Sequence, residues 1–139
     1  MNPHTHCDVM VLSSETGASA HPYWYARILG IFHAKVLHMG PAAKNHSVQH
    51  MEFLWVQWFG MEPDYVSGAH VACFPKVGFV PNTDNGAFGF LDSSLVIYGC
   101  HLVPAFATGR TQTLLHTTSP TAAHLPNEID DWMNYYVIM

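Results

Sequence analysis

Charged side chains are scarce in this chain. Only 11% of its 139 residues are Asp, Glu, Lys or Arg, against about 25% in a typical soluble domain. Five residues are basic and they form no continuous stripe, so the sequence lacks the electrostatic footprint of a strong nucleic-acid binder. A surface so poor in charge favours association with partners, because few like charges keep apolar patches apart.

Cysteine is also rare, and no apolar stretch is long. Cys7, Cys73 and Cys100 are odd in number and widely spaced, which argues against a disulfide framework and favours a reducing compartment. No run approaches the roughly 18 apolar residues that span a bilayer. Residues 1–20 lack the basic start and apolar core of a secretory signal. We therefore expect an intracellular protein, nuclear or cytoplasmic, with no membrane partner.

Two dense aromatic runs, at residues 21–32 and 51–60, carry most of the information. Aromatic and β-branched residues dominate both runs, which is typical of β-strands. We expect strands over residues 23–37 and 51–59. The alternation in the first run breaks at Gly30, which indicates a bulge or a sharp bend. Both faces of this run are largely apolar, so we expect a strand that is covered on two sides.

Shorter elements follow with clear turn signals. We expect strands at 76–80, 88–91 and 101–107, and Pro104 confines the last of these to an edge or a bulge. Asp92 is placed to cap one helical turn, and residues 126–132 resemble the start of a second. The predicted fold class is mostly β: a small, partly open β-barrel with one or two short helices.

The chain length suits a single domain. Residues 1–20 are small and polar, and we expect a flexible N-terminal tail there with one short strand at Asp8–Leu12. Residues 21–139 then form one β-rich domain, since no linker interrupts them. The sequence stops within an apolar run at 135–139, so we expect the domain to be truncated at this end.

No pattern in the sequence indicates catalysis or a metal site. Most acidic residues lie in predicted turns, where they bond locally rather than hold the paired metal ions of a nuclease. These residues are Glu62, Asp64, Asp84, Asp92, Asp130 and Asp131. His4, His6 and Cys7 are zinc-type donors, as are His46 and His50, but no partner pair stands at zinc-finger spacing. We expect no enzyme activity, no metal and no cofactor.

Cysteine chemistry is likewise not indicated. Cys100 and His101 are neighbours on a predicted strand, so their side chains point to opposite faces and do not form a nucleophile–base pair. A buried cysteine that packs as a small apolar residue is the favoured interpretation.

Aromatic rings are the best candidates for a binding site. Tyr23, Tyr25, Phe53 and Trp55 would share one barrel face if the two runs pair, and such rings attract cations such as methyl-lysine. The alternative is that these rings are plain core packing. The other apolar side chains of the two runs are predicted to be core: Ile28, Phe32, Leu54, Val56 and Trp58.

The order of motifs resembles a conserved block of fungal transposon-encoded proteins. The residues that carry the likeness are 21–33, 51–60, 77–81, 87–92 and 101–111. The block occurs late in large transposase-like proteins of the Plavaka type, related to CACTA-like elements, in mushroom-forming fungi. The likeness covers residues 21–139 and excludes the nuclease domain of such proteins. It implies a non-catalytic module within, or left over from, a transposase-like protein.

A more distant likeness bears on the fold. Residues 23–32, 56–59, 88–92 and 96–100 are similar in order to the motifs of bromo-adjacent homology domains, which are β-rich chromatin-binding modules. Loop lengths differ, so no ligand residue carries over. The likeness implies a chromatin-targeting module whose partner is a histone tail or another protein. Two alternatives stay open: a nucleic-acid-binding accessory domain of a transposase, and a degenerate fragment without present function.

Overall fold

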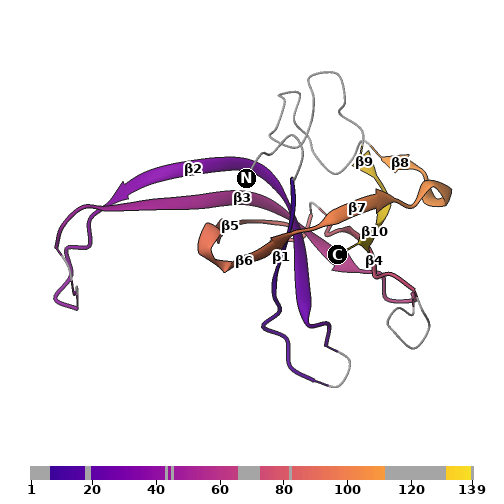
Figure 1. Cartoon of the computed structure of the whole chain (residues 1–139), viewed down its shortest axis with the longest axis horizontal. Helices are drawn as coiled ribbons and strands as arrows, with labels where there is room; N and C mark the ends of the chain where they lie inside the picture. Colours follow the sequence, from indigo (N-terminus) through magenta and orange to yellow (C-terminus); the bar gives the residue numbers. More distant parts are fainter. Residues whose placement is uncertain are drawn as a thin grey trace.

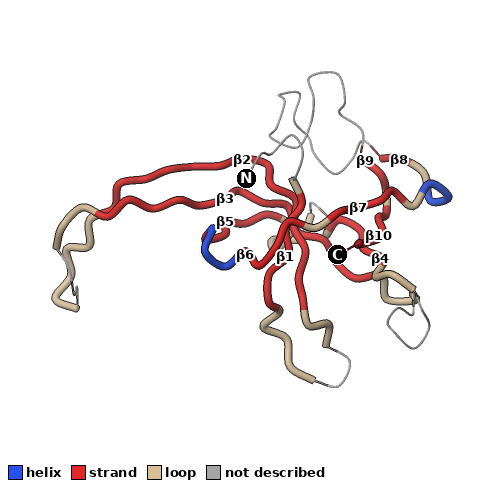
Figure 2. The backbone as a smooth tube through the Cα atoms, in the orientation of Figure 1, coloured by secondary structure: helices blue, strands red, loops and turns tan. Residues whose placement is uncertain are grey.

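The chain folds mostly into β-structure. The computed structural model describes residues 7–17, 20–42, 44, 46–65, 73–81, 83–111 and 131–138. Strands dominate the backbone trace (Figure 2), and the helices in the described part are two single 3-10 turns. None of these helices is long and apolar enough to cross a membrane. The predicted mostly β class is therefore confirmed.

The predicted strands lie close to their expected positions, except that the strand expected at 101–107 ends at Pro104, and residues 106–108 form a 3-10 turn instead. The strands are β1 (Asp8–Leu12), β2 (Tyr23–Val36), β3 (Gln49–Met61), β4 (Lys76–Phe79), β5 (Phe88–Asp92), β6 (Val96–Gly99), β7 (His101–Pro104), β8 (Arg110–Thr111), β9 (Asp131–Trp132) and β10 (Asn134–Ile138). The 3-10 turns are η1 (Ser93–Leu95) and η2 (Phe106–Thr108). Asp92 caps η1 by accepting a hydrogen bond from the Ser94 amide, as predicted. A second helix was expected at 126–132. Residues 126–130 lie outside the described part of the chain, and residues 131 and 132 form β9.

Eight strands form one antiparallel sheet in the order β6-β1-β2-β3-β4-β10-β7, with β5 paired to β3 beside β4. β8 and β9 make a separate two-stranded pair. Among the described strands no pairing joins β6 to β7, so a closed barrel is not found. Pro104 lies in the edge strand β7, as its missing backbone N–H predicts.

β2 and β3 form the longest pair, and its far half projects from the body of the domain (Figure 1). The paired residues 31–36 and 49–54 are called the arm below. At its base the register shifts between Ile28 and Gly30, which confirms the predicted bulge. A Cβ at Gly30 would lie 2.9 Å from Cε2 of Phe32, so the missing side chain leaves room for that ring.

Two buried clusters lie on opposite faces of β1, β2 and β3, which confirms that β2 is covered on both sides. Tyr25, Phe59 and Val77 belong to the first cluster, and Val9 and Ile28 belong to the second. Alternate residues of each strand enter different clusters, because successive side chains point to opposite faces. Ile28, Leu54 and Val56 are core as predicted.

Two of the packing predictions need correction. Phe32, predicted to be core, is 46% exposed because it lies beyond the bulge, where one face of the hairpin has no cover. β1 is present at the residues predicted, but it packs between β2 and β6 and its Val9 is fully buried. These five residues therefore form an interior strand of the sheet, next to the edge strand β6, and are not part of a loose tail.

A buried ion cluster ties β1 and β2 to the C-terminal strands. Arg27 donates from Nε to Oδ1 of Asp8 over 2.8 Å and from Nη1 to Oδ1 of Asp131 over 2.9 Å. Nη1 also lies 3.3 Å from the Tyr135 hydroxyl oxygen. Burial alone would lower the pKa of Arg27, but the charge and hydrogen bond of Asp8, with smaller contributions from Tyr135 and Cys7, together outweigh burial and raise the pKa above its ordinary value. Asp131, predicted to be a solvated turn residue, is instead 3% exposed because it pairs with Arg27.

Candidate functional site

A cavity of about 510 Å³ opens where the start of β2 meets the end of β3. The segment that follows β1 and the turn that follows β4 form its rim, through Glu15 and Gly86. Five aromatic side chains line it: Tyr23, Trp24, Tyr25, Trp58 and Phe59. Its volume lies within the range of about 300–1,000 Å³ that is typical of small-ligand sites.

The rings around the cavity come from both faces of the β2–β3 pair, because the cavity lies at the end of the sheet. Trp24 and Trp58 meet edge to face, with ring centroids 6.1 Å apart. The His21 ring lies 5.8 Å from the Tyr25 ring and 6.4 Å from the Tyr23 ring. Nδ1 of His21 lies 2.9 Å from the Tyr23 carbonyl oxygen, which holds the imidazole at the wall.

The charged groups of the cavity favour a cation. Glu15 contributes a carboxylate to the lining, and no lysine or arginine is among the described residues that line it. Arg27 lies behind the wall, but it is already paired with Asp8 and Asp131. Aromatic faces add a negative potential at their centres. A positively charged, weakly hydrated group therefore fits this cavity better than an anion does.

Tyr25 lines the cavity but its hydroxyl is buried. This residue is only 1% exposed, and its hydroxyl has no hydrogen-bond partner among the described residues. Burial, followed by the nearby Cys100 and Tyr23, raises the pKa of Tyr25 to about 12, so the hydroxyl stays neutral. An unpaired buried hydroxyl costs about 1–3 kcal/mol, so this group lowers the stability of the domain.

The structure brings together only half of the predicted aromatic site. Tyr23 and Tyr25 line the cavity, whereas Phe53 and Trp55 do not. Trp55 lies four residues from Phe59, which is the β3 partner of Tyr25, and this separation is about 13 Å along a strand. All four residues share a face by alternation, but they occupy different positions along it.

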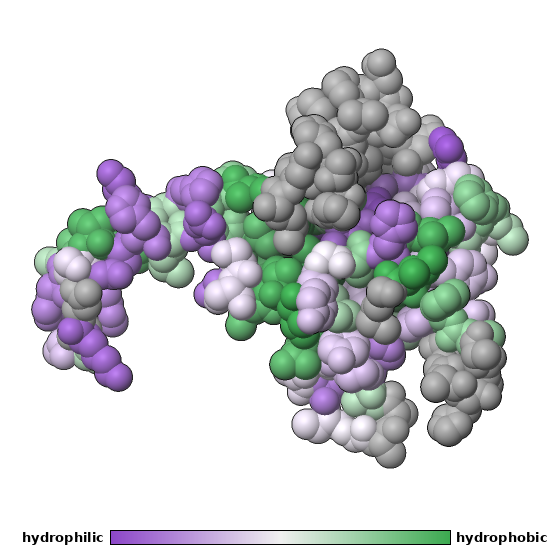
Figure 3. Space-filling model, viewed as in Figure 1, coloured by the Kyte–Doolittle hydropathy of each residue, from purple (hydrophilic) through white to green (hydrophobic). Residues whose placement is uncertain are grey.

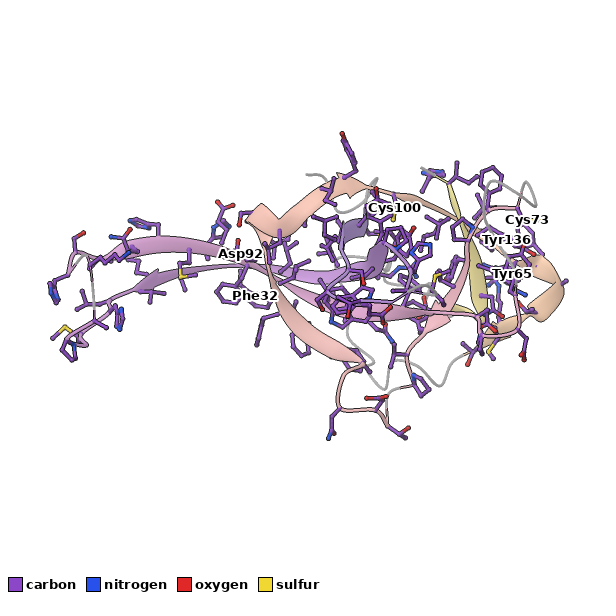
Figure 4. The ribbon with its side chains drawn as sticks, turned by 90° about the horizontal axis from the view of Figure 1, so that it is seen from below. Phe32, Tyr65, Cys73, Asp92, Cys100 and Tyr136 are labelled. Carbon is purple, nitrogen blue, oxygen red and sulfur yellow. The ribbon has the colours of Figure 1, made fainter. Side chains whose placement is uncertain are left out.

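Phe53 and Trp55 belong to a second group of rings at the base of the arm. Phe53 stacks on Phe32 with centroids 5.7 Å apart, and Trp55 packs against Phe88 and Phe90 at 5.9 and 4.8 Å. Figure 4 shows Phe32 and Asp92 together at the base of the arm, well away from Tyr65, Cys73 and Tyr136, which lie at the end of the molecule opposite the arm.

Sequence reasoning missed Glu15, His21, Trp24 and Trp58 as cavity residues. Trp58 was assigned to the core, and it is indeed partly buried against the second cluster, but the end of its strand also faces the cavity. The alternation of the strands assigns Trp24 and Trp58 to the face opposite Tyr23. A signal for the cavity lay in the two sequence segments at 13–20 and 81–86, whose Gly, Ser, Asn and Asp residues favour turns next to the strand ends.

Other kinds of site find little support in the described residues. No three His, Cys, Asp or Glu side chains there lie close enough to share a metal ion, and His4 and His6 lie outside the described residues. Asp84 accepts a hydrogen bond from the Gly86 amide, as expected of a turn residue. Cys100 packs within the first cluster while His101 is exposed, and burial raises the pKa of the Cys100 thiol to about 12.

Comparison with known proteins finds no family model, no curated protein and no solved structure that matches this chain. The functional argument therefore rests on the cavity and its chemistry.

Proposed function

We propose that this domain is a non-catalytic interaction module that holds a methylated lysine of another protein, such as a histone tail, in the aromatic cavity. The observation that carries the proposal is the lining: five aromatic residues and the acidic Glu15, with no lysine or arginine among the described lining residues. Each ring over which a cation lies contributes about 0.5–2 kcal/mol, with the larger values in desolvated sites.

The biological setting is the second part of the proposal. We infer that the module targets a fungal transposon-encoded protein to chromatin in the nucleus. The support for this setting is the order of motifs along residues 21–111, which is similar to Plavaka-type proteins and, more distantly, to bromo-adjacent homology domains. A partly open barrel of the latter type is the fold that this proposal implies.

Peptide titration tests the first part directly. Trp24 and Trp58 line the cavity, so their fluorescence should change in a saturable way when a histone-tail peptide with a di- or trimethylated lysine is added. The unmethylated peptide should bind at least about tenfold more weakly, since a primary ammonium ion loses more hydration on entering an aromatic cavity.

Matched variants locate the binding. Tyr23→Ala should abolish the fluorescence change, and Glu15→Gln should weaken binding up to about fivefold, the effect of one exposed charge. Tyr98→Ala and Glu52→Gln are controls, because both residues are exposed and neither lines the cavity. Absence of a saturable signal with every methylated peptide, from a protein that melts cooperatively, would refute the proposed cavity function.

Nucleic-acid binding by the arm is the second candidate. His33, Lys35 and His50 lie on one face of the arm, and Glu52 is its one carboxylate. Binding of DNA that weakens steeply with salt at mildly acidic pH, where histidines gain charge, would support this function. Flat binding curves at low salt would eliminate it.

A further inference from the structure

The arm has two chemically different faces. Phe32 pairs with Phe53 and Val36 pairs with Gln49, while His33 pairs with Glu52 and Lys35 pairs with His50. Paired residues share a face and neighbours along a strand alternate. One face therefore carries rings and aliphatic groups, and the other carries all the charged groups of the arm.

The apolar face continues without interruption onto the body of the domain. Phe32 stacks on Phe53, Phe53 meets Phe90 edge to face at 5.4 Å, and Phe90 contacts Trp55. We call this surface the apolar stripe. Its members are Phe32, Val36, Met51, Phe53, Trp55 and Phe90.

The stripe is open to solvent in the single chain. Phe90 is 67% exposed and Phe32 is 46% exposed, and Val36 and Met51 are also exposed. An isolated two-stranded ribbon is marginally stable in water, and along residues 31–36 β2 pairs with β3 alone. In the space-filling view the outer part of the arm is mostly hydrophilic, while hydrophobic residues gather where the arm meets the body (Figure 3).

We propose that the apolar stripe is a dimer interface, covered by the same stripe of a second copy around a two-fold axis. The stripe holds no charged side chain, so the surface that covers it must also be uncharged, and the stripe itself meets that requirement. In an isologous interface the same patch of each subunit faces that patch on the other subunit. This arrangement buries the rings while Lys35 and Glu52 stay in water on the opposite face.

The size of the stripe predicts a weak dimer. From Gln49 to Gln57, β3 runs for nine residues, which is about 30 Å, and two or three strands with their side chains are about 10–15 Å wide. The flat footprint is therefore about 400 Å² for each copy, or about 800 Å² in total, which is below the roughly 1,200–2,000 Å² of standard interfaces and in the class of weak, transient ones. We expect a reversible dimer with a dissociation constant in the micromolar range.

Sedimentation velocity over about 1–300 μM, a range that brackets such a constant, tests the proposal. The wild-type protein should shift from monomer to dimer as its concentration rises. Phe90→Ser should weaken this dimer about tenfold or more. Phe106→Ser is the matched control, since Phe106 is 68% exposed but lies in η2, outside the stripe, and it should dimerise like the wild type.

A second variant guards against loss of fold. Met51→Lys places a charge within the apolar stripe, which would be buried in the dimer, so it should also prevent dimerisation while the far-ultraviolet circular dichroism spectrum stays unchanged. A protein that remains monomeric throughout the range would overturn the proposal. A dimer that survives both Phe90→Ser and Met51→Lys would overturn it equally.

Discussion

Replacing Arg27 by methionine should come close to unfolding this domain. Arg27 is 8% exposed and bonds to two carboxylates, Asp8 and Asp131, that are 7% and 3% exposed. Removing one partner of a buried ion pair costs about 3–5 kcal/mol, because it leaves an uncompensated buried charge. Here two carboxylates lose their cation at once, so we expect at least the upper end of that range.

That loss is comparable to the whole stability of a small domain, about 5–15 kcal/mol. Urea denaturation followed by tryptophan fluorescence measures the free energy of unfolding of each variant without the screening that a guanidinium salt would introduce. Arg110→Met provides the control. Arg110 is exposed and lies 4.7 Å from the Trp132 ring centre, so its loss should cost no more than about 1 kcal/mol.

A double-mutant cycle then isolates the pairing. Asp131→Asn removes one of the two charges that Arg27 compensates, so Arg27→Met should cost less in that background than in the wild type. The reasoning fails if Arg27→Met and Arg110→Met lower the free energy of unfolding by the same amount, or if the two effects in the cycle simply add.

Two further predictions concern packing and pH. A Cβ at Gly78 would lie 2.9 Å from Asn134 Nδ2 and 3.1 Å from the Met133 carbonyl oxygen, so Gly78→Ala should lower the free energy of unfolding by about 1–3 kcal/mol through overpacking. Gly86→Ala is the control, because a Cβ there meets only an Asp84 oxygen at 3.4 Å, and it should change stability little. Equal melting temperatures for the two variants would contradict this prediction. Burial raises the pKa of Cys100 from 9.0 to about 12 and that of Tyr25 from 10.0 to about 12, so the unfolded chain ionises first and stability, fully present below pH 9, should fall between pH 9 and 12. The melting temperature of Cys100→Ala should fall less steeply with pH over this range than that of the wild type. An identical pH dependence would refute the assignment of this loss of stability to Cys100.

Local features of the fold could be predicted because their causes are local. Gly30 marks the bulge, Asp92 caps its turn and Pro104 lies in an edge strand. Each of these outcomes depends on the backbone preferences of one residue or on a hydrogen bond to a near neighbour. The exposure of Phe32 could not be predicted in the same way, because it depends on whether another strand covers that end of the hairpin.

The candidate site was only half predictable for a related reason. The period of two assigns Tyr25 and Trp55 to one face, and this assignment is compatible with the observed register. It does not say how far along the strand the partner rings lie, and a shift of four residues separates groups by about 13 Å. Glu15 and Gly86 reach the cavity from loops whose paths depend on the whole sheet.

The sequence by itself determined a mostly β chain built around two long aromatic strands, since composition and alternation act residue by residue. The tertiary structure alone decided which distant residues meet. It pairs Arg27 with Asp131, 104 positions away, and it closes a ring-lined cavity from segments between Glu15 and Gly86. Distant residues such as Arg27 and Asp131 meet only when many strands fold together and bury them. The backbone preference of a single residue cannot supply the free energy that pairing buried charges requires.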